Sequence, residues 1–421
     1  MTFSVKNNND VMSVLSAGNK CTGCGVCVDV CACQAISLKE DINGFYYPSV
    51  DADRCVSCDK CDKTCHAVHS ENIKRNEIGK AYAFWSLEED IILNSASGGV
   101  FAQIAKEFLQ KSDNGVVVGA YLAPDNKTYH IEIQSEQDII KLQNSKYQHS
   151  IATGIYTTVK KRLSEGRSVL FSGTPCMVAA LYHFLQSNGS ALDKLYTIEI
   201  LCHGIPTSEL LKIGLAIEQA DHICKYRTKS EGWLKGNRTV YEKAGVKYEK
   251  KNRRTDFLFR SYLTMSYLRP SCYDCQYARI NRVADITAGD YWGLNRQKYL
   301  NHNGVSLMIV NSEKGRRLVN DTSNIHVAPT SWRECLPYNQ NLFMATNNNF
   351  FNGWKHVAAI RKLPLSLRVF IYQNGFTNKY LQLVYHWLTR PVCFFRFLGK
   401  NRKRKQLCKS VLSQIERDGG E

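Results

Sequence analysis

Between residues 81 and 202 the chain alternates short apolar runs with longer stretches in which apolar positions recur every three or four residues. The apolar runs predict β-strands at 81–86, 115–122, 168–173 and 195–202. The intervening stretches predict helices at 99–112, 156–166 and 176–189. Helices that separate apolar strands are typical of an α/β fold with a largely parallel sheet, in which ligands bind at the carboxyl ends of the strands.

Residues 21–65 follow a different pattern, which is set by cysteines. The chain has 17 cysteines, and two runs at 21–31 and 55–65 each read C-x2-C-x2-C-x3-C. This spacing is typical of two [4Fe-4S] clusters in which the fourth cysteine of each run ligates the other cluster. The spacing predicts one cluster on Cys21, Cys24, Cys27 and Cys65, and a second on Cys55, Cys58, Cys61 and Cys31.

The segment 35–54 between the two runs predicts short strands joined by an Asn-Gly turn at Asn43-Gly44, as in the bacterial dicluster ferredoxins that residues 21–65 resemble. Paired C-x2-C motifs also build zinc ribbons, but two complete four-cysteine runs favour iron. Two features depart from the ferredoxin pattern. The proline that usually follows the fourth cysteine is Ala32 in one run and His66 in the other, and Cys33 leaves the ligand choice beside Cys31 open.

Length and charge narrow the possible functions. A chain of 421 residues suits two or three domains, and neither a signal-like start nor a run of about 20 apolar residues is visible, so we expect a cytoplasmic protein. The net charge is +17, but 14 Lys/Arg against three Asp/Glu from Gly353 onward place +11 of it in the tail. This distribution argues against a core that binds nucleic acid.

Two loops that leave predicted strands carry small residues in front of a helix, at 94–99 and 172–176. Backbone N–H groups at such a helix start can bind an anion such as a pyrophosphate. Ordinary helix capping by Ser95 or Ser97 is the alternative.

Four further cysteines lie outside the N-terminal runs. Cys176 follows one predicted strand, Cys202 ends the next, and Cys272 and Cys275 form a C-x2-C pair. Together they could complete a third four-thiolate site. Inert buried cysteines, or a zinc site at the C-x2-C pair, are the alternatives.

A series of motifs in order makes the chain similar to a known family. The motifs are SASGGVFAQIAKEFL, NSKYQHS (144–150), LFSGTPCMVAAL, LCHGIP, YRTKSEGW (226–233), SCYDC, RVADITAGDYWG (282–293) and NGVSLMIVNSEKG (303–315). Over about residues 20–345 the chain resembles the beta subunits of coenzyme F-420 hydrogenases and dehydrogenases, in their form with an N-terminal dicluster ferredoxin. With its fused cysteine module and basic tail, it is most similar to a bacterial subgroup associated with surface-polysaccharide biosynthesis.

The resemblance implies a flavin-binding α/β core, usually with FAD, fused to an α+β ferredoxin-like module. It implies that Cys176, Cys202, Cys272 and Cys275 hold a third [4Fe-4S] cluster near the flavin. The residues implied for flavin binding are Ser95, Ser97, Gly98, Gly99, Lys146, Tyr147, Gly173 and Thr174.

The candidate catalytic residues are His203, Lys146 and Asp290. His203 could relay protons or could simply hydrogen-bond near a cluster ligand. Five charged residues match family positions and could face cofactor or substrate, or form structural ion pairs: Arg227, Lys229, Arg282, Asp285 and Asp290.

We therefore expect a dicluster domain at 1–75, a flavin and [4Fe-4S] core at 78–345, and a basic aromatic tail at 346–421. The expected function is an oxidoreductase that takes electrons from ferredoxin or a similar low-potential donor and reduces a small molecule or a lipid-linked glycan through FAD. The alternatives are a subunit that exchanges electrons with a deazaflavin coenzyme for a partner hydrogenase or dehydrogenase, and a redox sensor without turnover. Assembly as a homo-oligomer is compatible with each of these functions.

The tail segment 381–405 places Trp387, Phe394, Phe395 and Phe397 beside the basic run KNRKRK. This pattern fits a segment lying on an anionic membrane surface, which would make the protein peripheral on the inner face. A C-terminal helix packed on the core, with a solvated basic end, is the alternative.

Overall fold

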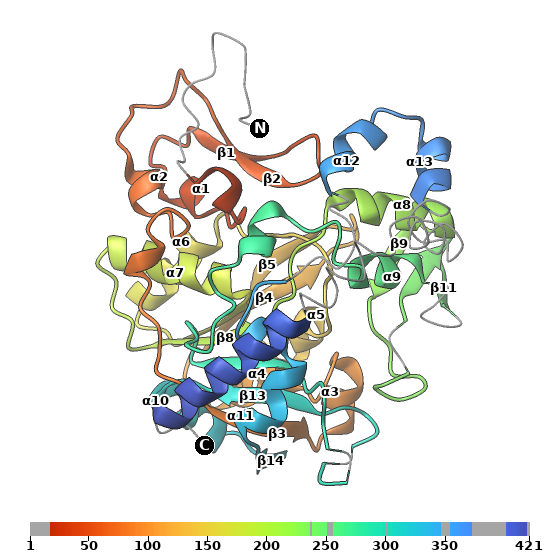
Figure 1. Ribbon diagram of the computed structural model, residues 1–421. Coiled ribbons are helices and arrows are strands. Elements are labelled where there is room, and N and C mark those ends of the chain that lie inside the picture. Colours follow the sequence, from red (N-terminus) through yellow and green to blue (C-terminus); the bar gives the residue numbers. More distant parts are fainter. Residues whose placement is uncertain are drawn as a thin grey trace.

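A nine-stranded sheet forms the centre of the computed structural model, which describes residues 17–235, 238–250, 256–295, 297–299, 301–346, 354–372 and 401–418 (Figure 1). The strand order is β14-β3-β13-β12-β8-β7-β4-β5-β6. The strands are β3 Lys80–Ser86, β4 Val116–Leu122, β5 Thr128–Ile133, β6 Ser150–Ile151, β7 Val169–Gly173, β8 Leu195–Ile200, β12 Ile286–Asp290, β13 Ser306–Val310 and β14 Ile325–Pro329.

The α/β fold class predicted from the apolar pattern is confirmed, but the sheet is mixed rather than largely parallel. Strands β12, β8, β7 and β4 run parallel in the middle, whereas β13, β3 and β14 add antiparallel pairings on one side and β5 pairs antiparallel with β4 on the other. A short turn, in which Ala123 N donates to Lys127 O, joins β4 to β5. Such a tight connection permits only antiparallel pairing.

Helices cover both faces of the sheet, and alternate residues of each strand face opposite layers. Val117 and Leu170 pack with α4 on one face, whereas Val116 and Phe171 pack with α6 and α7 on the other. The helices around the large sheet are α3 Glu89–Asn94, α4 Val100–Lys111, α5 Ile139–Leu142, α6 Ile155–Ser164, α7 Pro175–Ser187, α10 Glu313–Asn320 and α11 Trp332–Cys335. The predicted strands and helices between residues 81 and 202 are therefore present.

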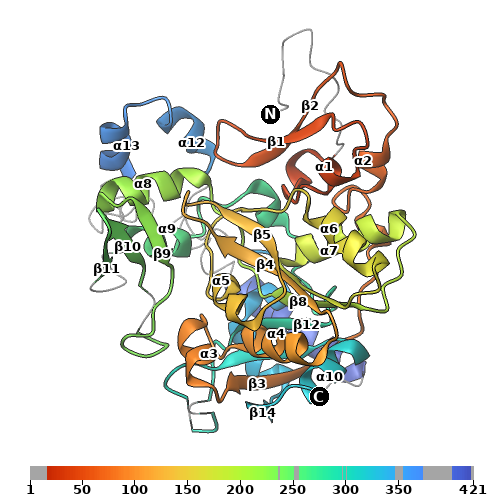
Figure 2. The ribbon, with the colours of Figure 1, turned by 180° about the vertical axis from the view of Figure 1, so that it is seen from behind.

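The N-terminal module, residues 17–68, consists of a hairpin and two short helices placed over α6 and α7 (Figure 1 and Figure 2). Its elements are α1 Val26–Val30, β1 Ile36–Glu40, β2 Tyr46–Val50 and α2 Lys60–Lys63. The predicted strands and turn are confirmed, with Gly44 at φ +80° in the turn. The module is joined to the core by the Asp29 carboxylate, which accepts hydrogen bonds from Gly154 N and Tyr156 N at the start of α6.

A second, three-stranded sheet with four helices lies beside the large sheet and buries its own apolar cluster. Its elements are α8 Ser208–Glu218, β9 His222–Lys225, β10 Val240–Lys243, β11 Val246–Glu249, α9 Phe257–Leu263, α12 Trp354–Ile360 and α13 Leu365–Ile371.

Residues 401–417 of the tail form a helix that packs Cys408 and Ile415 against a core cluster containing Trp332 and Leu336. For this part of the tail the structure agrees with the packed-helix alternative. The aromatic residues proposed to touch a membrane, Trp387, Phe394, Phe395 and Phe397, lie outside the described residues. No helix among the described residues is long and apolar enough to cross a membrane.

Candidate metal centres and the adjoining cavity

The first predicted set of ligands gathers around α1 and α2 in the interior. Cys24, Cys27 and Cys65 are buried, and Cys21 is half-buried. Burial raises the pKa of the Cys24 thiol well above its ordinary value, and its proximity to Cys27, Cys65 and Cys21 raises the pKa further. The fold therefore places these four cysteines, which lie at most 44 residues apart in the sequence, in one part of the module, and their role as ligands stays a prediction.

The second predicted set lies nearer the surface. Cys58 is exposed, whereas Cys55, Cys61 and Cys31 are half-buried. Burial, followed by the charges of Asp62 and Cys58, raises the pKa of Cys61 to about 11. Cys31 and Cys61 pack against the same small apolar cluster of the module. Of the two sets, this one is therefore the more accessible to another molecule.

The third predicted set lines one cavity of about 290 Å³ in the core. Cys176 lies in the first turn of α7, Cys202 follows β8, and Cys272 and Cys275 lie in and after the 3₁₀ turn Pro270–Asp274. Burial raises the pKa of Cys176 to about 11 and that of Cys272 to about 12. The N–H groups of Gly204 and Ile205 donate to Cys202 Sγ and Cys272 Sγ, each at 3.4 Å.

The four thiols share the wall of one cavity, and which metal group they hold stays a prediction. Within the described ranges, no three His, Cys, Asp or Glu side chains converge tightly enough to hold one metal ion. Bound iron would offset the cost of burying thiolates, because coordination deprotonates a thiol outright.

A second cavity, of about 280 Å³, contains most of the residues implied for flavin binding. Those that line it are Ser95, Ser97, Gly99, Lys146, Tyr147, Gly173 and Thr174. Gly98 does not line it, because its N–H donates to Ser306 Oγ and an added Cβ would collide with Phe84 O.

The loop before α4 has a free helix start that faces this cavity. Gly99 is the N-cap at φ +91°, and α4 receives no side-chain cap hydrogen bond in the described chain. Ser95 Oγ instead donates to Ile91 O, and Ser97 Oγ donates to Val305 O. The ordinary capping that was the alternative for these serines is therefore not observed, and the first N–H groups of α4 remain available to an anion.

The two cavities are neighbours. Both are lined by Thr22, Cys176, Cys202 and His203, and Cys24 of the N-terminal module lines the second cavity as well. Groups bound in the two cavities would be separated by these shared residues.

The three candidate catalytic residues all line the second cavity. Lys146 Nζ donates to Leu142 O and Gln143 O, and burial lowers its pKa to about 7. Burial also lowers the pKa of His203, despite the opposing effects of Asn341 and Asp290. The structure thus places these residues together, and their catalytic roles stay a prediction.

Asp290 is held by an ion pair within the same cavity. Arg227 Nη1 donates to Asp290 Oδ2 at 2.7 Å, and Trp233 Nε1 donates to Oδ1 at 2.9 Å. Burial by itself would raise the pKa of Asp290, but the charge and hydrogen bonds of Arg227 lower it below the ordinary value. Asp290 is therefore ionised at neutral pH.

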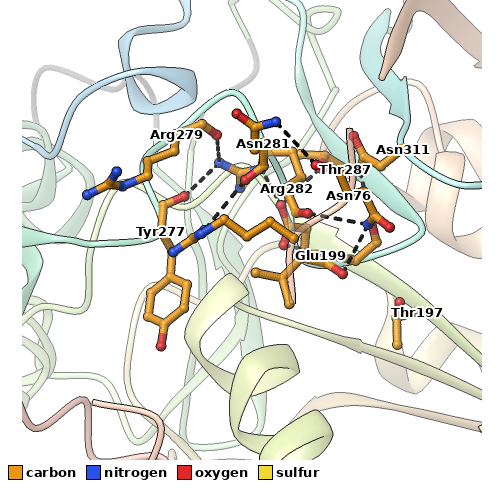
Figure 3. A network of polar contacts seen from close by, with 12 residues as sticks. Asn76, Thr197, Glu199, Tyr277, Arg279, Asn281, Arg282, Thr287 and Asn311 are labelled. Carbon is orange, nitrogen blue, oxygen red and sulfur yellow. Dashed lines mark hydrogen bonds and ion pairs between the residues drawn. The ribbon is translucent and has the colours of Figure 1, made fainter. Parts of the chain in front are cut away.

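The other charged family positions make hydrogen bonds or ion pairs within the chain, and whether they also face cofactor or substrate stays a prediction. Arg282 forms a buried ion pair with Glu199 and donates to Tyr277 O, in the network that also holds Asn76 and Asn311 (Figure 3). Asp285 accepts hydrogen bonds from Thr197 N and Oγ1. Lys229 Nζ donates to Ile92 O and Ser97 O, and burial, followed by the nearby Arg227, lowers its pKa to about 7.

Sequence reasoning missed two residues at these cavities. Ile200, at the end of the central strand β8, lines the second cavity and is 45% exposed. Arg269 lines the first cavity and is almost fully buried. The sequence could have indicated Ile200, because this residue lies at the end of a predicted strand. For Arg269 the sequence showed only that the residue lies near Cys272 and beside Pro270.

Models of known protein families match two parts of the chain. Residues 166–331 match the family described as the C terminus of the beta subunit of coenzyme F420 hydrogenase/dehydrogenase, and residues 20–67 match the 4Fe-4S dicluster domain. Both resemblances inferred from the motifs are confirmed.

Individual relatives are more distant. A protein of Methanocaldococcus jannaschii described as uncharacterized is 26% identical over 204 residues, which are 41% of this chain and 55% of that protein. This chain thus matches about half the length of that relative. A chain of the xenon-derivatised F420-reducing [NiFe] hydrogenase complex from Methanosarcina barkeri is 16% identical, with 72% of this chain and 91% of that chain covered and a TM-score of 0.43. A score at that level does not establish a shared fold.

Proposed function

We propose that this chain, which joins a 4Fe-4S dicluster domain to the C-terminal domain of the beta subunits of the coenzyme F420 hydrogenase/dehydrogenase family, is an electron-transferring oxidoreductase with three [4Fe-4S] clusters and a flavin. The observation that carries the proposal is the wall of residues shared by the thiol-lined cavity and the neighbouring cavity. Clusters exchange single electrons and a flavin exchanges one or two, so adjacent sites convert one kind of transfer into the other.

The accessibility of the thiols gives the proposed route a direction. The exposed Cys58 belongs to the set nearest solvent, where a donor can approach. The buried set follows, and its Cys24 packs in the same apolar cluster that Cys176 and Cys275 contact. Electrons from ferredoxin or a similar low-potential donor would enter at the outer set and leave at the second cavity.

Three features of the second cavity support a flavin. The uncapped start of α4 suits a phosphate, and Ile200 offers apolar surface to a planar ring. Lys146 lines the same cavity and, when protonated, would favour an anionic ligand. A volume of about 280 Å³ lies just below the range for ligand pockets, about 300–1,000 Å³. The ring system of a flavin therefore fits more readily than a whole FAD, part of which would extend outside.

The residues of this cavity have separate proposed roles. Lys146, with a pKa near 7, can hold or release a proton at Nζ under physiological conditions. Asp290 stays charged and fixes the Arg227 guanidinium at the cavity wall. The Cys176, Cys202, Cys272 and Cys275 thiolates would hold the cluster, and the neighbouring cavity would hold the flavin that supplies hydride chemistry.

The substrate that we propose is a small molecule or a lipid-linked glycan of surface-polysaccharide biosynthesis, reduced on the cytoplasmic side of a membrane. This part rests on the resemblance to the polysaccharide-associated subgroup and on the basic aromatic tail. The proposed division into residues 1–75, 78–345 and 346–421 is compatible with the two matched ranges.

Anaerobic purification with iron and flavin measured together tests the proposal. Three clusters predict about twelve irons per chain and two predict about eight. Reduced ferredoxin should then bleach the flavin in the isolated chain. Flavin reduction only by a reduced deazaflavin coenzyme would favour the partner-subunit alternative, and a chain with clusters but no flavin would favour a redox sensor.

A further inference from the structure

Among the described residues, Arg269 is a buried cation without a carboxylate partner. Its side chain is 1% exposed, and it forms no ion pair with any residue that the structure describes. The other deeply buried arginines of the core are paired, Arg227 with Asp290 and Arg282 with Glu199. A buried positive charge without a partner is costly and is rarely retained unless a negative charge lies nearby.

The guanidinium lies between the N-terminal module and the third set of cysteines. Arg269 Nη1 donates to Cys21 O at 3.3 Å, and Nη2 donates to Tyr46 O at 2.7 Å. The same group lies over the Tyr47 ring, 4.7 Å from its centroid, and its Nε is buried without a partner in the described ranges. The arginine is therefore fixed from the module side, although it belongs to the core loop that leads to Cys272.

The backbone of both segments is built to admit this side chain. Arg269 N donates to Ile205 O and Arg269 O accepts from Cys272 N, which ties the residue to the thiol-lined loop. On the module side, Gly23 lies at φ +70°, and an added Cβ would contact Arg269 Nη2 at 2.6 Å. The glycine between Cys21 and Cys24 thus provides the space that the guanidinium occupies.

The negative charge that Arg269 would face is that of the bound clusters and their thiolates. The Arg269 guanidinium interacts electrostatically with the side chains of Cys272 and Cys176. Arg269 also lines the cavity that these two cysteines share with Cys202 and Cys275. A [4Fe-4S] cluster with four thiolates is anionic and gains one more negative charge on reduction.

From this geometry we infer that Arg269 is a shared counter-cation for two clusters, the one held by Cys21, Cys24, Cys27 and Cys65 and the one held by Cys176, Cys202, Cys272 and Cys275. A fixed positive charge stabilises the reduced state of each cluster and so raises its reduction potential. Arg269 thereby keeps both clusters reducible by the same donor. The second half of this inference rests on the proposed third cluster.

The test is an EPR-monitored redox titration of the anaerobic full-length protein, with dithionite as the reductant that donates one electron to each cluster. In Arg269→Gln the potentials of the two clusters beside Arg269 should become more negative, whereas the potential of the outer cluster on Cys31, Cys55, Cys58 and Cys61 should stay unchanged. Arg269→Lys, which keeps the charge, should leave all potentials close to those of the unmodified protein.

Arg279→Gln is the matched control, because Arg279 lines the same cavity but is exposed to solvent. It should leave the potentials nearly unchanged, since water screens the charge.

Unchanged potentials in Arg269→Gln, or equal shifts in the Gln and Lys variants, would overturn the inference. If Arg269→Gln also loses iron, iron that is retained in Arg269→Lys supports a role of the positive charge, whereas an equal loss of iron in both variants overturns the inference. If the protein holds only eight irons and one potential still shifts in Arg269→Gln, the third cluster is rejected. The role of Arg269 at the cluster of Cys21, Cys24, Cys27 and Cys65 is then retained.

Discussion

The phenol oxygen of Tyr277 is hydrogen-bonded to ring Nδ1 of His66, across the boundary between the core and the N-terminal module. His66 directly follows Cys65, and Tyr277 lies two residues after Cys275. The other ring nitrogen of His66 is 3.2 Å from Thr22 Oγ1. A buried hydrogen-bonded pair therefore links the chain segments of two candidate clusters, at the position where the ferredoxin pattern has proline.

Removing this hydrogen bond should weaken the attachment of the module. Tyr277→Phe leaves a buried imidazole nitrogen without its partner, which costs about 1–3 kcal/mol of unfolding free energy. Anaerobic urea unfolding measures the loss. Tyr129→Phe, which removes a surface hydrogen bond to Asp125, is the control and should change stability by less than about 0.5 kcal/mol. Equal stability of both variants would contradict the buried link.

The third cluster can be tested through its ligand on α7. Cys176→Ser should lower the iron content by about a third, from about twelve to about eight irons per chain, while the N-terminal clusters remain. Iron analysis together with EPR spectroscopy gives the answer. Cys224→Ser alters an exposed cysteine outside all three sets and should keep the full iron content. An unchanged iron content in Cys176→Ser would show that this cysteine is only a small buried side chain.

Removing one partner of the buried ion pair between Arg282 and Glu199 should strongly destabilise the protein. Glu199→Gln leaves the Arg282 guanidinium buried without its counter-charge, and breaking such a pair costs about 3–5 kcal/mol. Urea unfolding should show the loss. In the double variant Glu199→Leu/Arg282→Met no unpaired charge remains, so most of the stability should return. A double variant as unstable as the single one would instead assign the loss to altered packing.

Acid stability should depend on His130. Burial lowers the pKa of this histidine to about 4, and its ring nitrogens are used by Ser150 Oγ and Ser172 O. Between about pH 6.5 and 4 the unfolded chain binds a proton here that the folded chain does not. The free energy of unfolding therefore falls with decreasing pH in this window, by up to about 1.4 kcal/mol per pH unit.

His130→Gln can make the same two hydrogen bonds but cannot titrate. Urea unfolding at a series of pH values should give a shallower slope between about pH 4 and 6.5 for this variant, and the same slope as the unmodified protein above about pH 6.5. An unaltered slope in the acidic window would show that His130 does not contribute to the acid sensitivity.

The sequence patterns predicted those structural features that depend on residues close together in the chain. The run 168–173 is apolar because both faces of β7 are covered, and the cysteine spacing at 21–31 reflects one local loop. The pairing of β14 with β3 joins residues about 240 positions apart, and no local pattern encodes it. The antiparallel side of the sheet was missed for this reason.

In the candidate site, too, the residues marked by a local sequence pattern could be predicted and the others could not. Cys176 and Cys202 could be placed together because each follows a strand of a parallel pair, whose carboxyl ends meet at one edge. Arg269 gave no such signal, since a single arginine before a proline is ordinary in a surface loop. Its burial depends on Gly23 and Tyr46, which belong to a segment more than 200 residues earlier.

The burial of Cys24 and Cys27 beneath the core has a consequence for biosynthesis. The N-terminal module is synthesised before Arg269, Tyr277 and the C-x2-C loop that close over it, which follow about 200 residues later. Domains fold largely in that order during synthesis. The inner cluster of the module should therefore be inserted while the nascent chain still lacks its core, and the finished protein should accept iron there only after partial unfolding.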